Sequence, residues 1–113
     1  RSRKPPAMND ILKSLEQTIL ARRAADPETS YVASLRAKGR AKMAEKLGEE
    51  AIEAVIAAVQ DDKAAMTGEG ADLLFHLMVL LADMDLSLDH VIAELARREG
   101  LSGLDEKAAR GAN

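Results

Sequence analysis

Four carboxylates recur at helical spacing near the middle of this chain. Glu50 and Glu53 form a Glu-x-x-Glu pair, and Glu69 and Asp72 form a Glu-x-x-Asp pair. Residues three apart lie on the same side of a helix, so each pair places like charges together, which destabilises an isolated helix by about 0.2–0.5 kcal/mol. The pattern indicates a missing positive partner. Oxygen donors in a chain without cysteine suit Mg²⁺, or alternatively Mn²⁺, better than zinc.

The first pair lies on a two-faced helix that we predict from about Arg40 to Gln60. Its polar arc carries lysines and glutamates, and its opposite side is apolar. We expect these residues on the apolar side: Met43, Leu47, Ala51, Ala54, Val55, Ala58 and Val59. A polar arc of this kind is also typical of a solvated helix surface, with Lys46 paired to Glu50. Both interpretations remain open for this helix alone.

The second pair lies on a helix, predicted from about Lys63 to Met84, that is apolar almost all round. Between Ala71 and Ala82 its polar side chains are Asp72 and His76. Such a helix sits in the middle of a bundle, where an isolated carboxylate is costly unless it is paired or bound to a metal. A lone histidine here is more often a hydrogen-bonded core residue than a ligand. We therefore expect that His76 is not itself a metal ligand but lies next to the ligands, where it could orient Asp72 or a bound water.

Capping and breaking residues predict the remaining helices. We expect helices over 11–23, 31–38 and 88–99. Asn9, Ser30 and Ser87 precede them as N-caps, and Gly39 and Gly100 end the last two. No strand pattern competes with this assignment. The predicted fold is all-α, an antiparallel bundle of about five helices.

Length and composition limit the possible functions. A chain of 113 residues is one domain by length, and we divide it into a flexible arm over 1–7, a folded domain over 8–100 and a tail over 101–113. Aromatic residues make up 2% of the chain and the net charge is −3. Base stacking and phosphate-backbone binding are therefore disfavoured, and nucleic acid is not an expected partner.

The same composition argues against a membrane or secreted protein. The longest apolar run, Leu77 to Ala82, is far too short to span a bilayer. The basic start RSRKPP has no apolar segment behind it and does not read as a signal peptide. The lack of cysteine excludes disulfides and thiolate chemistry. We expect a cytoplasmic protein with no membrane partner.

Longer stretches of the chain carry a family resemblance. SYVASL begins at Ser30, KG follows at 38–39, KLGEEAIEA begins at Lys46, and EGADLLFHLMVLLADMDLSLDHVIAELARREG begins at Glu69. Together they resemble the phosphoribosyl-ATP pyrophosphatase family, one of the all-α, MazG-like nucleoside triphosphate pyrophosphatases. The resemblance runs from about Ile11 to Gly100, and the tail SGLDEKAAR is also similar to bacterial members.

The resemblance implies a reaction and a set of metal ligands. The reaction is hydrolysis of 1-(5-phospho-β-D-ribosyl)-ATP to the corresponding AMP derivative and pyrophosphate, the second step of histidine biosynthesis. Glu50, Glu53, Glu69 and Asp72 match the family's metal-binding positions. Such a reaction needs a divalent cation to neutralise the triphosphate, a positioned water, and cations around the phosphate oxygens.

Other charged residues are candidates for the remaining roles. Glu49 precedes the metal positions on the same helix and could accept the proton of the attacking water or bind a further metal ion. Lys38, Lys42 and Lys46 are candidate phosphate contacts. Each alone is better explained as an ordinary helix-surface lysine, and only a neighbouring metal site favours phosphate contact. Glu45 departs from the pattern, because the family frequently has a basic residue there.

Gly68 and Gly70 are a second departure. They flank Glu69 where helix formers are expected, and each glycine costs a helix interior about 0.5–1 kcal/mol relative to alanine. We expect this segment to be loose until metal and substrate order it.

Three rival functions use parts of the same pattern. A house-cleaning pyrophosphatase acting on non-canonical nucleotides would use the same four carboxylates, and only the flanking motifs favour the histidine-pathway substrate. A non-catalytic helical interaction module does not explain Asp72 within ADLLFHL. A di-iron bundle would need Glu-x-x-His on its helices, which this chain lacks.

The predicted helices leave their apolar stripes poorly covered in a single chain. Five short helices from 113 residues cannot surround every apolar side chain. We therefore expect a homodimer with isologous helix packing.

Overall fold

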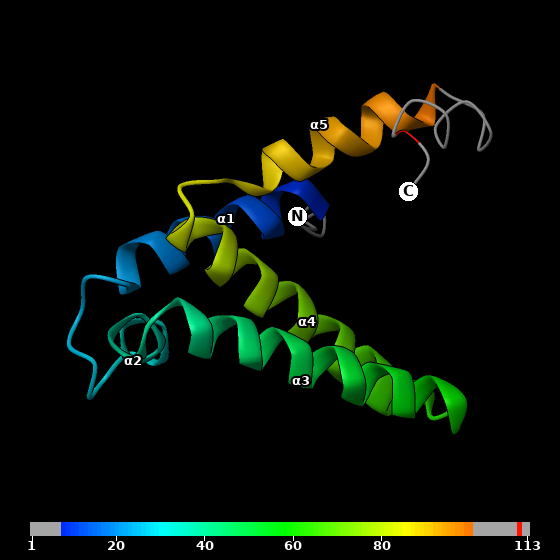
Figure 1. The fold of residues 1–113 in the computed structure, drawn as a ribbon, viewed down its shortest axis with the longest axis horizontal. Helices are drawn as coiled ribbons and strands as arrows, with labels where there is room; N and C mark the ends of the chain where they lie inside the picture. The colour runs from blue at the N-terminus through cyan, green and yellow to red at the C-terminus, as the bar shows by residue number, and fades with distance from the viewer. Residues whose placement is uncertain (1–7, 101–110, 112–113) are drawn as a thin grey trace, which may run out of the picture.

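The computed structural model describes residues 8–100 and residue 111. Within these residues the chain forms helices and no strand (Figure 1). The helices are α1 (Met8–Arg22), α2 (Tyr31–Lys38), α3 (Arg40–Val59), α4 (Lys63–Asp83) and α5 (Leu88–Glu99). The all-α prediction is confirmed. The predicted arm over 1–7 and nearly all of the predicted tail lie outside the described residues.

Local capping chemistry sets most helix boundaries, as the sequence predicts. The hydroxyl of Ser30 accepts the backbone N–H of Ala33 at the start of α2. Gly39, with a φ of 101°, ends α2 and begins α3, because this left-handed conformation strains any side chain with a Cβ. The prediction that Asn9 caps α1 is wrong. Helix α1 begins at Met8, so Asn9 lies inside its first turn, where a short polar residue is tolerated.

Helices α3 and α4 form an antiparallel hairpin with the most extensive helix contact in the described chain (Figure 1). The turn between them uses Asp61, whose φ of 54° is a conformation that aspartate tolerates better than most residues. Asp62 then caps α4 by accepting the N–H of Ala65 at 3.0 Å. The short turn fixes the register of the two helices, so residues at similar distances from it face each other.

A small core lies where α1 and α2 meet the half of the hairpin that is far from its turn. It consists of Ile19, Val32, Leu35, Met43, Met78, Val79 and Ala82. Two arginines add hydrogen bonds at the C-terminal end of α4. Arg23 donates to the carbonyl of Ala82, and Arg40 binds both the carboxylate and the carbonyl of Asp83. Cations at a helix C-terminus are favourable because unpaired carbonyls accumulate there. Helix α4 is thus anchored at one end.

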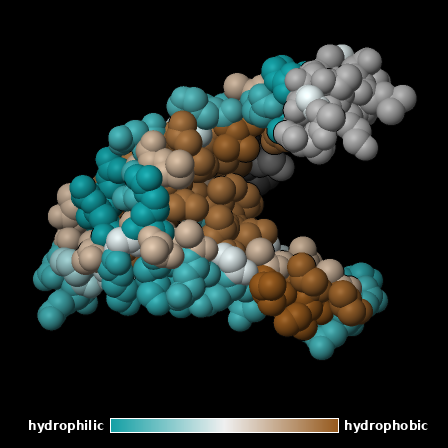
Figure 2. Space-filling view, viewed as in Figure 1, coloured by the Kyte–Doolittle hydropathy of each residue, from teal (hydrophilic) through white to brown (hydrophobic). Residues whose placement is uncertain are grey.

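The rest of the hairpin extends beyond this core, which corrects two expectations. The predicted apolar side of α3 is only partly buried, since Val55 is 59% exposed and Val59 is 82% exposed. Helix α4 was expected in the middle of the bundle, yet its Leu74 is 46% exposed. The physical reason is that α1 and α2 cover only the end of the hairpin that carries the core. Figure 2 shows apolar surface on the hairpin's far end and on the concave side of the molecule.

Helix α4 is long and apolar enough to cross a membrane by length and composition alone, as the one such helix in the described part of the chain. The core helix of a soluble protein passes the same test. Packing of α4 along α3, with Glu69 and Asp72 in its middle turns, agrees with a helix of a folded bundle.

Candidate active site

The α3–α4 hairpin brings together the carboxylates that the sequence singles out. One oxygen each from Glu50 on α3 and from Glu69 and Asp72 on α4 lie within 4.8 Å of one another. Glu53 adjoins this group, because its side chain hydrogen-bonds to those of Glu50 and Glu69. Two pairs from different helices thus form one acidic cluster. The tight turn at 61–62 brings the two pairs together, because it places the acidic face of α3 opposite the acidic face of α4.

Repulsion within the cluster shows in its proton affinity. The pKa of Glu69 rises from 4.5 to about 7, first because its carboxyl shares a hydrogen bond with Glu53, then because it is desolvated and surrounded by negative charge. Burial, followed by the hydrogen bond and charge of Glu53, also raises the pKa of Glu50. Both shifts have the same two main causes, which are desolvation and the nearby carboxyl of Glu53.

Two oxygens of the cluster are buried without any hydrogen-bond partner. They are Oε2 of Glu50 and Oε2 of Glu69. A desolvated carboxylate oxygen without a donor or cation is costly, so unpartnered buried oxygens pointing at the same cluster fit a bound metal ion. The donor set is oxygen only, which fits Mg²⁺ or Mn²⁺.

The burial of these acids differs from the sequence expectation in one respect. Asp72 was expected on a helix in the buried middle of the bundle, and in this chain its side chain is exposed. The reason is the open side of α4 described above. The buried oxygens belong to Glu50 and Glu69, which face each other across the hairpin.

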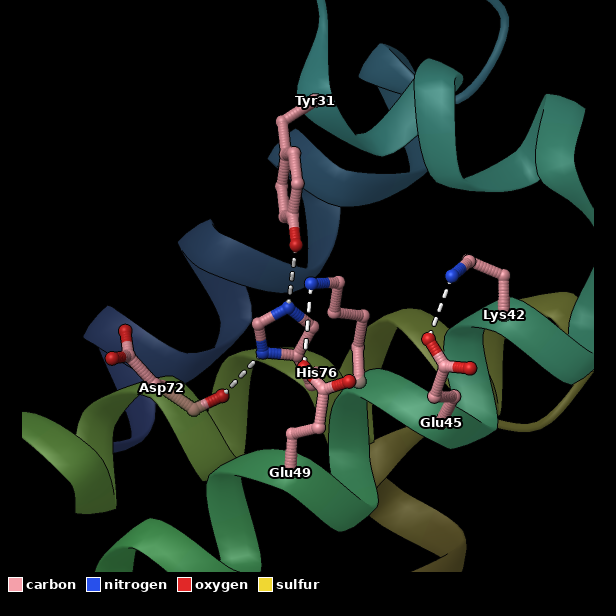
Figure 3. A network of polar contacts seen from close by, with 7 residues as sticks. Tyr31, Lys42, Glu45, Glu49, Asp72 and His76 are labelled. Carbon is pink, nitrogen blue, oxygen red and sulfur yellow. Dashed lines mark hydrogen bonds and ion pairs between the residues drawn. The ribbon is translucent and has the colours of Figure 1, made fainter.

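His76 lies next to the cluster but does not contact the carboxylate of Asp72. It is 6% exposed, and its Nδ1 lies 2.9 Å from the main-chain carbonyl oxygen of Asp72. Its Nε2 lies 2.9 Å from the hydroxyl of Tyr31, at the start of α2 (Figure 3). Sequence analysis missed Tyr31, because it lies 45 positions away from His76 and no local pattern pairs the two. The available signal was the position of Tyr31 within SYVASL, one of the stretches that resemble the family.

The candidate phosphate-binding lysines are spread along one edge of the site. Lys42 pairs with Glu45 at 2.6 Å, and Lys46 pairs with Glu49 at 3.4 Å (Figure 3). The alternative pairing of Lys46 with Glu50 is therefore not formed. Hydrogen bonding and charge from Glu49 raise the pKa of Lys46.

The third lysine, Lys38, is the last residue of α2 and is exposed. Its ammonium group has no ion pair with the described residues. Lys42 and Lys46 lie one turn apart on the same face of α3, whereas Lys38 comes from the end of α2. Exposed i,i+3 pairs such as those of Lys42 and Lys46 contribute little stability, and both ammonium groups exchange partners readily.

Comparison with known proteins decides the family. The family model described as phosphoribosyl-ATP pyrophosphohydrolase matches residues 12–99. The chain belongs to this family. A phosphoribosyl-ATP pyrophosphatase of Rhizorhabdus wittichii is 65% identical over 91% of this chain and 97% of its own length. Proteins with the same name from Erythrobacter litoralis and Rhodobacter capsulatus are 66% and 59% identical, over 90% and 88% of this chain and 98% and 97% of their own lengths.

Family membership confirms the resemblance seen in the sequence. The matched segment includes the four clustered carboxylates, the candidate lysines and the Tyr31–His76 pair. The acidic cluster therefore lies within the part of the chain that defines the family, and not in a segment peculiar to this protein.

The raised pKa of Glu69 predicts how stability depends on pH without metal. The folded state keeps a proton that the unfolded state releases above pH 4.5, so this contribution to stability is present at low pH and is lost as pH rises to about 7. We expect the melting temperature of chelator-treated protein to fall over this range. Scanning calorimetry of Glu69→Gln should show a weaker fall, whereas Glu28→Gln, an exposed loop glutamate, should behave as wild type. Identical pH profiles for Glu69→Gln and wild type would contradict this account.

Proposed function

We propose that this chain is a phosphoribosyl-ATP pyrophosphatase. The reaction is hydrolysis of 1-(5-phospho-β-D-ribosyl)-ATP to 1-(5-phospho-β-D-ribosyl)-AMP and pyrophosphate, in the second step of histidine biosynthesis. The observation that carries the proposal is the cluster of Glu50, Glu53, Glu69 and Asp72, with two unpartnered buried oxygens, inside the segment that matches the family. The names of the relatives support the same activity.

The four carboxylates are proposed to hold Mg²⁺, or alternatively Mn²⁺, between the two helices of the hairpin. When bound, the cation would neutralise phosphate oxygens and make a bound water more acidic. Glu50 and Glu69 contribute the oxygens that lack partners, and Asp72 contributes an oxygen from the exposed edge. Glu53, whose hydrogen bond and charge raise the pKa of Glu69, is proposed as the fourth ligand.

The reacting water and the phosphates are proposed to be handled by neighbouring residues on α3. Lys46 and Lys42 are paired with Glu49 and Glu45 in the free protein. A triphosphate binding nearby competes for the ammonium groups, at low cost because exposed ion pairs contribute only about 0–1 kcal/mol. Transfer of Lys46 to a phosphate would leave the Glu49 carboxylate free to accept the proton of the attacking water. Lys38 is proposed to contact the phosphates from the end of α2.

A homodimer is proposed from the surface that the single chain leaves exposed. Exposed apolar residues on the hairpin include Ile52, Val55, Ile56, Val59 and Met66. Helix α5 contains no buried residue, although its Ile92 and Leu95 lie on one apolar stripe. Exposed apolar surface of this extent is typical of protein interfaces. The substrate, and the absence of cysteine, agree with a cytoplasmic enzyme that needs neither nucleic acid nor a membrane.

The substrate assignment is tested by pyrophosphate release. We expect rapid release from phosphoribosyl-ATP in the presence of Mg²⁺, slow release from ATP and deoxynucleoside triphosphates, and none in excess chelator. Preference for deoxynucleoside triphosphates or modified nucleotides would instead identify a house-cleaning pyrophosphatase. If no nucleotide is hydrolysed, the enzymatic functions are excluded and a non-catalytic interaction module is the remaining function.

The metal assignment is tested by Asp72→Asn and Glu53→Gln. Each change should lower kcat by several orders of magnitude, because a ligand is lost. Each should leave the metal-free protein as stable as wild type, or more stable, because repulsion within the cluster is reduced. The rise in melting temperature caused by Mg²⁺ should shrink or vanish. Asp89→Asn, at an exposed position on α5, serves as the control. Large destabilisation without metal, together with retained activity, would mean that the acids hold the fold instead.

The dimer is tested by placing a charge on the hairpin. Val59→Lys changes a residue that is 82% exposed in the single chain, so it should not unfold the protein. In a dimer it should weaken association, because a charge is costly in an apolar interface. Sedimentation equilibrium should give twice the chain mass for wild type and for the control Gln17→Lys, and a lower mass for Val59→Lys. A wild-type mass of one chain at every concentration would exclude the dimer.

A further inference from the structure

A groove continues the acidic cluster towards the turn of the α3–α4 hairpin. It has a volume of about 240 Å³ and is lined by Glu53, Ile56, Ala57 and Gln60 of α3 and by Ala65 and Glu69 of α4. Glu53 and Glu69 are also members of the cluster. The groove and the proposed metal site therefore share two residues, and a ligand held at the cluster can extend into the groove.

Apart from these carboxylates, the groove offers apolar walls and a single amide. Ala57 is buried and Ile56 is 49% exposed. Gln60 ends α3, and its backbone N–H donates to the carbonyl of Ile56 at 3.0 Å. Its side-chain amide has no hydrogen bond to the described residues. Apolar walls with a few polar groups that fix orientation are typical of small-molecule sites.

The order of side chains along α3 places the cluster between this groove and the candidate lysines. Lys46, Glu53 and Gln60 are seven residues apart, which is close to two helical turns. They therefore lie on one side of α3 at intervals of about 10 Å. A ligand with phosphates at one end and an apolar ring at the other matches this order.

We propose that the groove binds the adenine ring of the substrate, while the β- and γ-phosphates point towards Lys46. The inference rests on the proposed function and adds an orientation of the substrate on the hairpin. Release of pyrophosphate breaks the bond between the α- and β-phosphates, so these phosphates belong at the cluster. The nucleoside and the leaving pyrophosphate then lie on opposite sides of it. The groove is smaller than the roughly 300–1,000 Å³ of a site for a whole ligand, which agrees with its holding one part of the substrate.

Gln60 is the specificity-determining residue of this orientation, because its amide can pair with the edge of adenine that stays free. The phosphoribosyl group occupies N1 of the ring, which blocks the Watson–Crick edge and leaves N6 and N7 available. A glutamine amide pairs with both atoms, donating to N7 and accepting from N6–H. The groove is open to solvent on one side, so the phosphoribosyl group has room outside it.

The first test compares the two products of the reaction, which would occupy opposite sides of the cluster. Isothermal titration calorimetry with Mg²⁺ gives the affinities for phosphoribosyl-AMP and for pyrophosphate. We expect Gln60→Leu to bind phosphoribosyl-AMP about tenfold more weakly than wild type, and pyrophosphate within about threefold of wild type. Lys46→Ala should mainly weaken pyrophosphate binding. Unchanged phosphoribosyl-AMP affinity in Gln60→Leu, or a larger loss of it in Lys46→Ala, overturns the inference.

A substrate analogue tests the contact with N7 directly. Phosphoribosyl-7-deaza-AMP has a carbon in place of N7 and cannot accept the hydrogen bond from Gln60. Wild type should bind it about tenfold more weakly than phosphoribosyl-AMP, whereas Gln60→Leu should bind the two alike. Equal affinities in wild type, or the same discrimination in Gln60→Leu as in wild type, overturn the inference.

A larger side chain in the groove gives a test with a matched control. Ala65→Leu fills part of the groove, whereas Ala64→Leu adds the same atoms at a neighbouring exposed position that does not line it. We expect Ala65→Leu to raise KM for phosphoribosyl-ATP about tenfold with little change in melting temperature, because it removes binding of the base and leaves the reacting phosphates in place. Ala64→Leu should behave as wild type. Equal KM values for the two variants overturn the inference.

The other candidate occupant of the groove is a second copy of the chain, because Ile56 also belongs to the surface proposed for the dimer. In that case Ala65→Leu would lower the mass found by sedimentation and leave the affinity for phosphoribosyl-AMP unchanged. This result overturns the inference but not the proposed function. Failure of wild type to hydrolyse phosphoribosyl-ATP has a separate meaning, which is that the proposed function itself is wrong.

Discussion

Repulsion between carboxylates across the α3–α4 hairpin is the constraint on which the rest of the structure depends. The hairpin turn forces Glu50 and Glu53 to face Glu69 and Asp72. A side-chain hydrogen bond with Glu53, desolvation and the neighbouring negative charges together raise the pKa of Glu69 to about 7. Such an arrangement is unfavourable in itself and has to be held by contacts elsewhere. In the proposed function, a bound cation would relieve this repulsion and make the same geometry a binding site.

The contacts that hold the cluster lie at the other end of the hairpin. The apolar core joins α1 and α2 to the start of α3 and the end of α4, and arginines bind the terminal carbonyls of α4. Stability and chemistry are therefore separated along the same pair of helices. Gly68 and Gly70, on either side of Glu69, have open space where a Cβ would stand, so no contact with the described residues requires them to be glycine.

The aromatic residues connect these two regions. Tyr31 enters from α2, whose Val32 and Leu35 belong to the core, and its hydroxyl reaches His76 behind the acidic cluster. Through His76, Tyr31 thus connects α2 to the main chain of α4 at Asp72. Because the bond is made by one hydroxyl, its influence can be separated from that of the ring, which packs on Phe75.

The sequence by itself determined the features that depend on neighbours a few positions away. Caps at Ser30 and Gly39, the hairpin turn and the acid pairs on one helical stripe are all local, because helix geometry fixes which residues share a face. The hypothesis of an oxygen-lined metal site followed from these pairs. The prediction that Asn9 caps α1 was wrong because the helix begins one residue earlier, at Met8. A single capping side chain does not fix a helix boundary to within one or two residues.

Only the tertiary structure decided burial and long-range pairing. It showed that Val55 and Val59 are exposed, that Asp72 is exposed while oxygens of Glu50 and Glu69 are buried, and that Tyr31 binds His76. Periodicity identifies an apolar face but cannot say what covers it, because cover comes from segments distant in the chain. For the same reason, the partners of a buried nitrogen or oxygen become known only when the packed helices bring them within hydrogen-bonding distance.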